Sequence, residues 1–188
     1  MSSVSVITAA LPSRLSMLGD ACASVRAQRH PAGEHLIGVD YDRRGSSAVR
    51  NDLLAAANGS WVAVLDDDDL LLPNHLEALI AASADADIVY SFCRVTGRPD
   101  GWTPNRAFDA DALREGNYIP VTALIRRSLL DDLHGWRNSA DCLYGFEDWR
   151  LWLDALDAGA RFVCVPSVTW VYRFGASNKT FVGEKAAA

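Results

Sequence analysis

The first half of the chain alternates short apolar runs with amphipathic stretches. Four runs rich in β-branched residues predict strands at residues 4–8, 34–40, 61–65 and 87–94. Between them, apolar residues recur at helical spacing, which predicts helices over residues 14–29, 43–58 and 74–84. Strands and helices that alternate with short connections predict an α/β fold, with a mostly parallel central sheet and helices on both faces.

The second half of the chain is less regular. Residues 97–105 contain two prolines and two glycines and predict a loop or a weak hairpin. Apolar spacing then predicts further helices and strands; the helices are 109–115, 128–133 and 147–159, and the strands are 121–125 and 162–165. We expect the polar, alanine-rich tail at 178–188 to be flexible.

Length and composition limit the class of protein. The 188 residues suit one domain, and 49% hydrophobic with 22% charged residues is typical of a soluble globular protein. The net charge of −6 argues against a general nucleic-acid binder, because phosphate contacts need a basic surface. No apolar run approaches the roughly 20 residues that a transmembrane helix needs, and no signal peptide is evident, so we expect a cytoplasmic protein.

The cysteines do not form a recognisable metal motif. They are widely spaced, contain no CxxC pair and have no histidine cluster beside them, which argues against structural zinc and predicts reduced thiols. The four are Cys22, Cys93, Cys142 and Cys164.

Four consecutive carboxylates, Asp66 to Asp69, follow the apolar strand at 61–65. Adjacent negative charges repel one another, and a divalent cation or several backbone N–H groups can offset that repulsion. Carboxylate oxygens suit Mg²⁺ or Mn²⁺, which keep positions for water and substrate phosphate. The alternative is a solvated acidic turn. Because the cluster comes directly after a buried strand, we favour a metal and phosphate site at the carboxyl edge of the sheet, near Thr8 and Asp40.

Several motifs in a fixed order resemble the GT-A-fold glycosyltransferases of family 2. They are the strand ending at Asp40, the pair Arg50-Asn51, the run Leu65 to Asp69, and Glu147-Asp148-Trp149. The resemblance covers roughly residues 4–173. It implies one GT-A domain over residues 1–177, with a nucleotide-sugar donor half at 1–95 and an acceptor half at 96–177.

The family pattern Asp-x-Asp-Asp matches Asp66, Asp68 and Asp69, with Asp67 at the variable position of the donor site. By this resemblance Asp68 is the direct ligand of Mn²⁺ or Mg²⁺. Asp66 lies near the ribose or a metal-bound water, and Asp69 serves the metal site or braces its loop. A bound cation would stabilise the charge that develops on a nucleoside diphosphate leaving group.

Further donor contacts follow from the same resemblance. Thr8 ends the first strand, Ala9 begins the loop after it, and both are assigned to the donor site. Asp40 is matched to an acidic residue that accepts a hydrogen bond from the base, which favours a UDP- or dTDP-sugar. Arg50 is expected to pair with the acidic cluster or a phosphate, and Arg173 to touch the diphosphate. Alternatively, Asp40 forms a turn and Arg50 is a surface arginine.

Glu147 and Asp148 open a predicted helix, where carboxylates often serve stability alone. The resemblance assigns Asp148 as the general base that takes a proton from the acceptor hydroxyl, with Glu147 orienting the acceptor or bracing the loop. Trp149, Trp136 and Trp102 are candidates for stacking on an acceptor sugar, although each also fits a core position.

The sequence therefore predicts a metal-dependent inverting glycosyltransferase, because one base without a second nucleophile favours direct displacement. The acceptor would be a small molecule, a glycan or a protein, and the chain could form a homodimer. One alternative is a degenerate GT-A-like module that binds a nucleotide or glycan without turnover. A nucleotidyltransferase is disfavoured, because no Gly-rich or basic phosphate loop follows the first strand.

Overall fold

The computed structural model describes residues 3–98, 100–101, 103–142 and 145–175. Within them, one sheet has the strand order β2-β1-β3-β6-β5-β7-β4. The strands are β1 Val4–Ala10, β2 Glu34–Val39, β3 Trp61–Val64, β4 Leu70–Leu71, β5 Ile88–Thr96, β6 Ala123–Arg126 and β7 Phe162–Arg173. Five of these strands run in one direction, while β6 and β4 run antiparallel to their neighbours.

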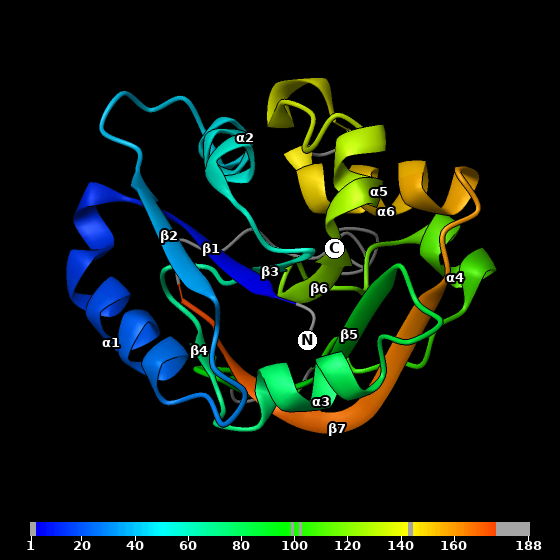
Figure 1. Ribbon diagram of the computed structural model, residues 1–188, viewed down its shortest axis with the longest axis horizontal. Coiled ribbons are helices and arrows are strands. Elements are labelled where there is room, and N and C mark those ends of the chain that lie inside the picture. The colour runs from blue at the N-terminus through cyan, green and yellow to red at the C-terminus, as the bar shows by residue number, and fades with distance from the viewer. Residues whose placement is uncertain (1–2, 99, 102, 143–144, 176–188) are drawn as a thin grey trace.

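Helices cover both faces of this sheet (Figure 1). The helices are α1 Leu15–Arg26, α2 Ser46–Ala56, α3 His75–Ala81, α4 Ala110–Glu115, α5 Arg127–Asp132 and α6 Glu147–Asp157, with 3-10 turns at Pro12–Arg14 and Ser139–Asp141. The apolar side chains of α1 and α3 form one core, and those of α2, α4, α5 and α6 form the other. Adjacent strand residues alternate between the two cores, as Val6 and Ile7 do in β1. The predicted α/β fold with helices on both faces is confirmed.

Three features of the sheet differ from the sequence-based expectation. Strand β4 was not predicted, and β7 continues past the predicted strand at 162–165, through Pro166, to Arg173. Its pairing with β5 shifts register beside Phe92, so the longer strand contains a local irregularity. Strand β6 lies between β3 and β5 and is antiparallel to both.

The tail at 178–188, expected to be flexible, lies outside the described residues.

The close approach of α2 to β2 brings the start of that helix to the carboxyl edge of the sheet. A Cβ at Gly38 of β2 would lie 2.6 Å from Cγ1 of Val49 on α2, so a side chain there would push the helix away. Arg50 is the next residue of α2, so the close packing of this helix on β2 also holds Arg50 at the carboxyl ends of the strands.

The described residues also show the state of the cysteines and whether any helix could span a membrane. All four cysteines are free thiols, as predicted. Across residues 3–175, apart from the three short gaps, no helix has both the length and the apolar character of a membrane span.

Candidate active site

A cavity of about 500 Å³ opens at the carboxyl ends of β1, β2 and β3 and extends to the first turn of α6. It brings together carboxylates that are far apart in the sequence. The lining includes most of the predicted site residues, namely Ala9, Asp40, Arg50, Asp66, Asp67, Asp68, Asp69, Glu147 and Asp148. The acidic cluster and the acidic pair of α6 thus face one space.

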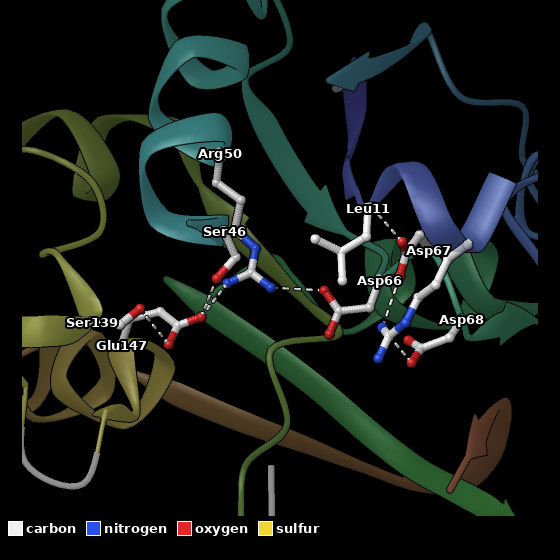
Figure 2. Close-up of polar contacts among 9 residues, drawn as sticks. Leu11, Ser46, Arg50, Asp66, Asp67, Asp68, Ser139 and Glu147 are labelled. Carbon is white, nitrogen blue, oxygen red and sulfur yellow. Dashed lines mark hydrogen bonds and ion pairs between the residues drawn. The ribbon is translucent and has the colours of Figure 1, made fainter. Parts of the chain in front are cut away.

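The acidic loop is tied to the segment that follows β1. Asp67 accepts hydrogen bonds from the backbone N–H of Leu11 at 2.7 Å and from Nη1 of Arg14 at 3.1 Å (Figure 2). The same Arg14 nitrogen lies 2.6 Å from Oδ2 of Asp68. Arg14 therefore neutralises part of the charge on the cluster, and Asp67 fixes the β1 loop against it.

The remaining carboxylates of this loop form a group that fits a divalent cation. One oxygen from each of Asp66, Asp68 and Asp69 lies within 4.8 Å of the others. Burial, and then the charge of Asp66, raise the pKa of Asp68 to about 6, against the opposing effect of Arg14. Burial also raises the pKa of Asp69 well above its ordinary value. Such crowded and desolvated oxygens gain from a cation, and they are the ligand type that Mg²⁺ and Mn²⁺ prefer.

Arg173 braces the acidic loop and does not line the cavity. Its backbone N–H donates to Oδ1 of Asp69 at 2.9 Å, and its guanidinium contacts the carbonyl of Asp68 and, at 3.1 Å, a carboxylate oxygen of Asp20. In this conformation the donors of Arg173 are directed at protein oxygens, and its expected contact with a donor diphosphate stays a prediction.

Arg50 links the two acidic regions through one buried guanidinium. The residue is 3% exposed; its Nη2 donates to Oδ1 of Asp66 at 2.7 Å, and its Nη1 donates to Oε1 of Glu147 at 3.0 Å (Figure 2). Burial opposes the charge of Arg50, but the two carboxylates offset this and raise its pKa. Ser46 and Ser139 also donate to Glu147, at 2.6 and 3.2 Å. Arg50 is thus not a surface arginine, and Glu147 is held in place by neighbours on two segments, α2 and the 3-10 turn at Ser139–Asp141.

Asp148 lies beside this network in the cavity. Its Oδ1 accepts the backbone N–H of Trp149 at 2.8 Å, a donor that has no partner within the helix because it belongs to the first turn of α6. Burial, and then the charge of Glu147, raise the pKa of Asp148 to about 6. This pKa leaves the carboxylate deprotonated above pH 6 and makes it a better proton acceptor than an ordinary aspartate.

Asp40 forms a turn at the end of β2 and also lines the cavity. Its two carboxylate oxygens accept the backbone N–H groups of Arg44 and Gly45, each at 2.8 Å. Gly45 has a φ of 91°, which favours glycine at this position. The turn-forming alternative is therefore observed. Each carboxylate oxygen has a second lone pair, so the turn leaves acceptor capacity for a ligand.

Three predicted contacts are corrected by burial. Thr8 is fully buried, pairs with Nε2 of His35 at 2.9 Å and does not line the cavity. Trp149 and Trp136 belong to the core, and the indole N–H of Trp149 donates to the carbonyl of Leu113. These indoles are therefore not placed to stack on an acceptor. The third candidate, Trp102, lies outside the described residues.

Several cavity residues had no clear signal in the sequence. Ser46 and Ser139 donate hydrogen bonds to Glu147, although they lie 101 and 8 positions away from it in the sequence. Nothing about an isolated serine predicts such a contact. Arg14 also lines the cavity. Asn117 lines the cavity from the loop after α4.

Comparison with known proteins now identifies the family. A model described as "Glycosyltransferase like family 2" matches residues 3–187. The chain belongs to this family. The family 2 chain is 28% identical over 157 residues to the succinoglycan biosynthesis protein ExoO of Rhizobium meliloti (strain 1021), an alignment that covers 73% of this chain and 44% of ExoO.

Solved structures share its fold. Residues 1–349 of S. aureus TarS, in complex with UDP-GlcNAc, give a TM-score of 0.69 at 16% identity, covering 94% of this chain and 60% of that one. The mannosyltransferase PcManGT from Pyrobaculum calidifontis, in complex with GDP-Man and Mn²⁺, also gives 0.69, at 17% identity, covering 94% and 58%. These likenesses show a GT-A fold. The family 2 chain spans about half the length of the relatives that it matches.

Replacing Arg50 with methionine tests the central ion pairs. We expect Arg50→Met to lower the free energy of unfolding by about 3–5 kcal/mol at pH 7.5, because the buried Glu147 loses its ion pair with Arg50. Urea denaturation measures this change. The matched control is Arg44→Met, whose partner Asp52 is exposed, with an expected loss of about 0–1 kcal/mol. Equal losses in the two variants would contradict a special role for Arg50.

The raised pKa of Asp148 predicts a stability gain on its removal. The folded protein holds the Asp148 proton more tightly than the unfolded chain, so this group lowers stability as the pH rises from about 4 through about 6. We expect Asp148→Asn to stabilise the family 2 domain by about 1–3 kcal/mol at pH 8 and to lose this advantage below pH 4. Thermal unfolding across that range measures it. The exposed Asp85→Asn serves as control, and a pH-independent difference for Asp148→Asn would refute the assignment.

Proposed function

We propose that this chain is the catalytic domain of an inverting, metal-dependent glycosyltransferase. It moves a sugar from a nucleoside diphosphate-sugar to an acceptor hydroxyl. The observation that carries this proposal is the single cavity lined by both the acidic loop and Asp148. A cation-binding group and a proton acceptor in one cavity supply the two kinds of chemistry that such a displacement needs.

The donor end of the proposed site is the acidic loop. Asp66, Asp68 and Asp69 would hold Mn²⁺ or Mg²⁺, with Asp68 as the direct ligand, and the bound cation would stabilise charge on the departing diphosphate. Complexes of TarS with UDP-GlcNAc and of PcManGT with GDP-Man and Mn²⁺ support a nucleotide-sugar donor. We favour a UDP- or dTDP-sugar, with Asp40 accepting a hydrogen bond from the base.

The acceptor end is the start of α6. Asp148 would remove the proton from the attacking hydroxyl, and the fixed Glu147 would hold that end of the cavity in shape through Arg50 and Ser46. A single base and one displacement invert the anomeric configuration. The acceptor class is a small molecule, glycan or protein. A cytoplasmic location and a homodimer stay predictions from the sequence.

Asp148→Asn is the direct test of the proposed base. We expect this variant to bind donor and Mn²⁺ with unchanged affinity and to lose transfer by at least about 100-fold, because general-base catalysis contributes about 10²–10⁴-fold. A panel of UDP-, dTDP- and GDP-sugars, screened by Mn²⁺-dependent thermal stabilisation, first identifies the donor.

For the parent protein, kcat should fall as the pH drops below about 6, because protonated Asp148 accepts no proton.

Product analysis completes this test. NMR of the product should show the anomeric configuration opposite to that of the donor, and Asp85→Asn should transfer like the parent protein. Transfer by Asp148→Asn at the parent rate would refute the base assignment. Calorimetric binding of nucleotide without donor turnover by the parent protein would instead favour the nucleotide-binding module.

Metal binding can be measured without turnover. We expect Asp68→Asn to weaken Mn²⁺ binding in the presence of UDP by about 10-fold or more, because a neutral amide replaces the proposed direct ligand. The electron paramagnetic resonance signal of free Mn²⁺ reports this affinity. Asp67→Asn is the matched control, since Asp67 is bonded to Leu11 and Arg14 and lies outside the proposed ligand set. Equal weakening in both variants would indicate general electrostatics rather than ligation.

A further inference from the structure

The wall of the cavity between α4 and β6 carries two polar side chains that the proposed mechanism does not use. Asn117 follows α4, and Thr122 immediately precedes β6. Both residues line the cavity, although they are only 6% and 1% exposed. Their polar atoms are therefore largely withdrawn from bulk water.

These polar atoms lack partners within the described part of the chain. Neither Nδ2 nor Oδ1 of Asn117 makes a hydrogen bond there, and neither does Oγ1 of Thr122. A buried polar atom without a partner costs about 1–3 kcal/mol, and folded proteins retain few of them. Three such atoms in one wall therefore call for a partner that enters the cavity.

Two half-buried amides in the same protein bond to the backbone with both their oxygen and their nitrogen. Asn51 accepts from the backbone N–H of Trp136 at 2.9 Å and donates to its carbonyl at 2.8 Å. Asn105 makes the same pair of bonds to the backbone of Cys93, at 2.7 and 2.8 Å. The fold thus satisfies these amides internally, and Asn117 differs from them by facing the cavity.

Asn117 also lies beside the proposed base. Although burial raises the pKa of Asp148, the nearby amide of Asn117 acts in the opposite direction and lowers it. No hydrogen bond of ordinary geometry joins the two side chains in the described structure. A ligand group that reaches Asp148 therefore comes within reach of Asn117 as well.

We propose that Asn117 and Thr122 form a subsite that recognises the hydroxyl groups of a sugar ring held beside Asp148. A sugar hydroxyl both donates and accepts, and an amide offers one acceptor and two N–H donors, so one amide can bind two neighbouring hydroxyls. The Thr122 hydroxyl supplies a third contact. A site built to bond hydroxyls discriminates strongly against ligands that lack them, because its own polar atoms then stay unpaired. This inference rests on the proposed function.

The first arm of the test uses the protein without ligand. Asn117→Ala and Thr122→Val remove atoms without an internal hydrogen bond. The comparison is made at about pH 4.5, where Asp148 is protonated and gains nothing from the amide, and there the ligand-free variants should melt at or above the parent temperature. The matched control Asn51→Ala leaves two backbone groups of Trp136 without their partner and should melt below it. A clear loss of stability in Asn117→Ala would assign the amide a structural role and overturn the subsite.

The second arm measures affinity by calorimetry in Mn²⁺, comparing UDP with UDP-GlcNAc and GDP with GDP-mannose. The variants should bind the free diphosphates like the parent protein and lose at least about tenfold in affinity for the sugar nucleotide that the parent prefers. If the ring instead belongs to the acceptor, the same loss should appear for free monosaccharides added with UDP and detected by saturation-transfer NMR. Unchanged sugar affinity in both measurements overturns the proposal and leaves water as the partner of these atoms.

The two hypotheses fail in different ways. A parent protein that binds UDP or GDP but no sugar in either measurement overturns the subsite and leaves the nucleotide site standing. A parent protein that binds neither nucleotide overturns the proposed function, whereas Asn117-dependent binding of a free sugar would then still support the subsite.

Discussion

The buried guanidinium of Arg50 connects the two ends of the cavity. It pairs with Asp66 after β3 and with Glu147 at the start of α6, so its position depends on both segments and fixes them relative to each other. Breaking one partner of a buried charge pair is costly, because the other charge is left desolvated. The separation between the acidic loop and Asp148 is thus set by an ion-pair bridge carried on α2, which itself packs closely on β2.

The charges around the cavity do not balance. Among the described residues, six carboxylates, those of Asp66 to Asp69, Glu147 and Asp148, outnumber the guanidinium groups of Arg14, Arg50 and Arg173 that act on them. Burial, and then the neighbouring carboxylates, raise the pKa values of Asp68, Asp69 and Asp148. An anionic diphosphate entering such a cavity is repelled unless positive charge accompanies it. The electrostatics therefore favour joint binding of donor and divalent cation over binding of the donor alone.

Local patterns in the sequence were enough to predict the elements and the acidic loop, because strand and helix periodicity and the position of a charge after a buried strand are local signals. Long-range pairing was not accessible in this way. The two-residue strand β4 is defined by its pairing with β7, a hundred residues later, and β7 itself continues beyond the predicted strand at 162–165 to Arg173. Tryptophan carries no local mark that separates a core position from a ligand contact, so the sequence left both open for Trp136 and Trp149, and the structure shows the core position. The family resemblance located Asp148, whereas the unpaired state of Asn117 is visible only in three dimensions.

The reversed direction of β6 has a topological consequence. The segment that enters an antiparallel strand lies at the edge where its parallel neighbours end, so the connection from α4 to β6 reaches the cavity even though it precedes a strand. One wall is therefore carried by a connection separate from the acidic loop and from α2. Loops of this kind tolerate changes of sequence and length more readily than the elements they join. Such a layout lets ligand preference diverge among proteins that keep the same electrostatic framework.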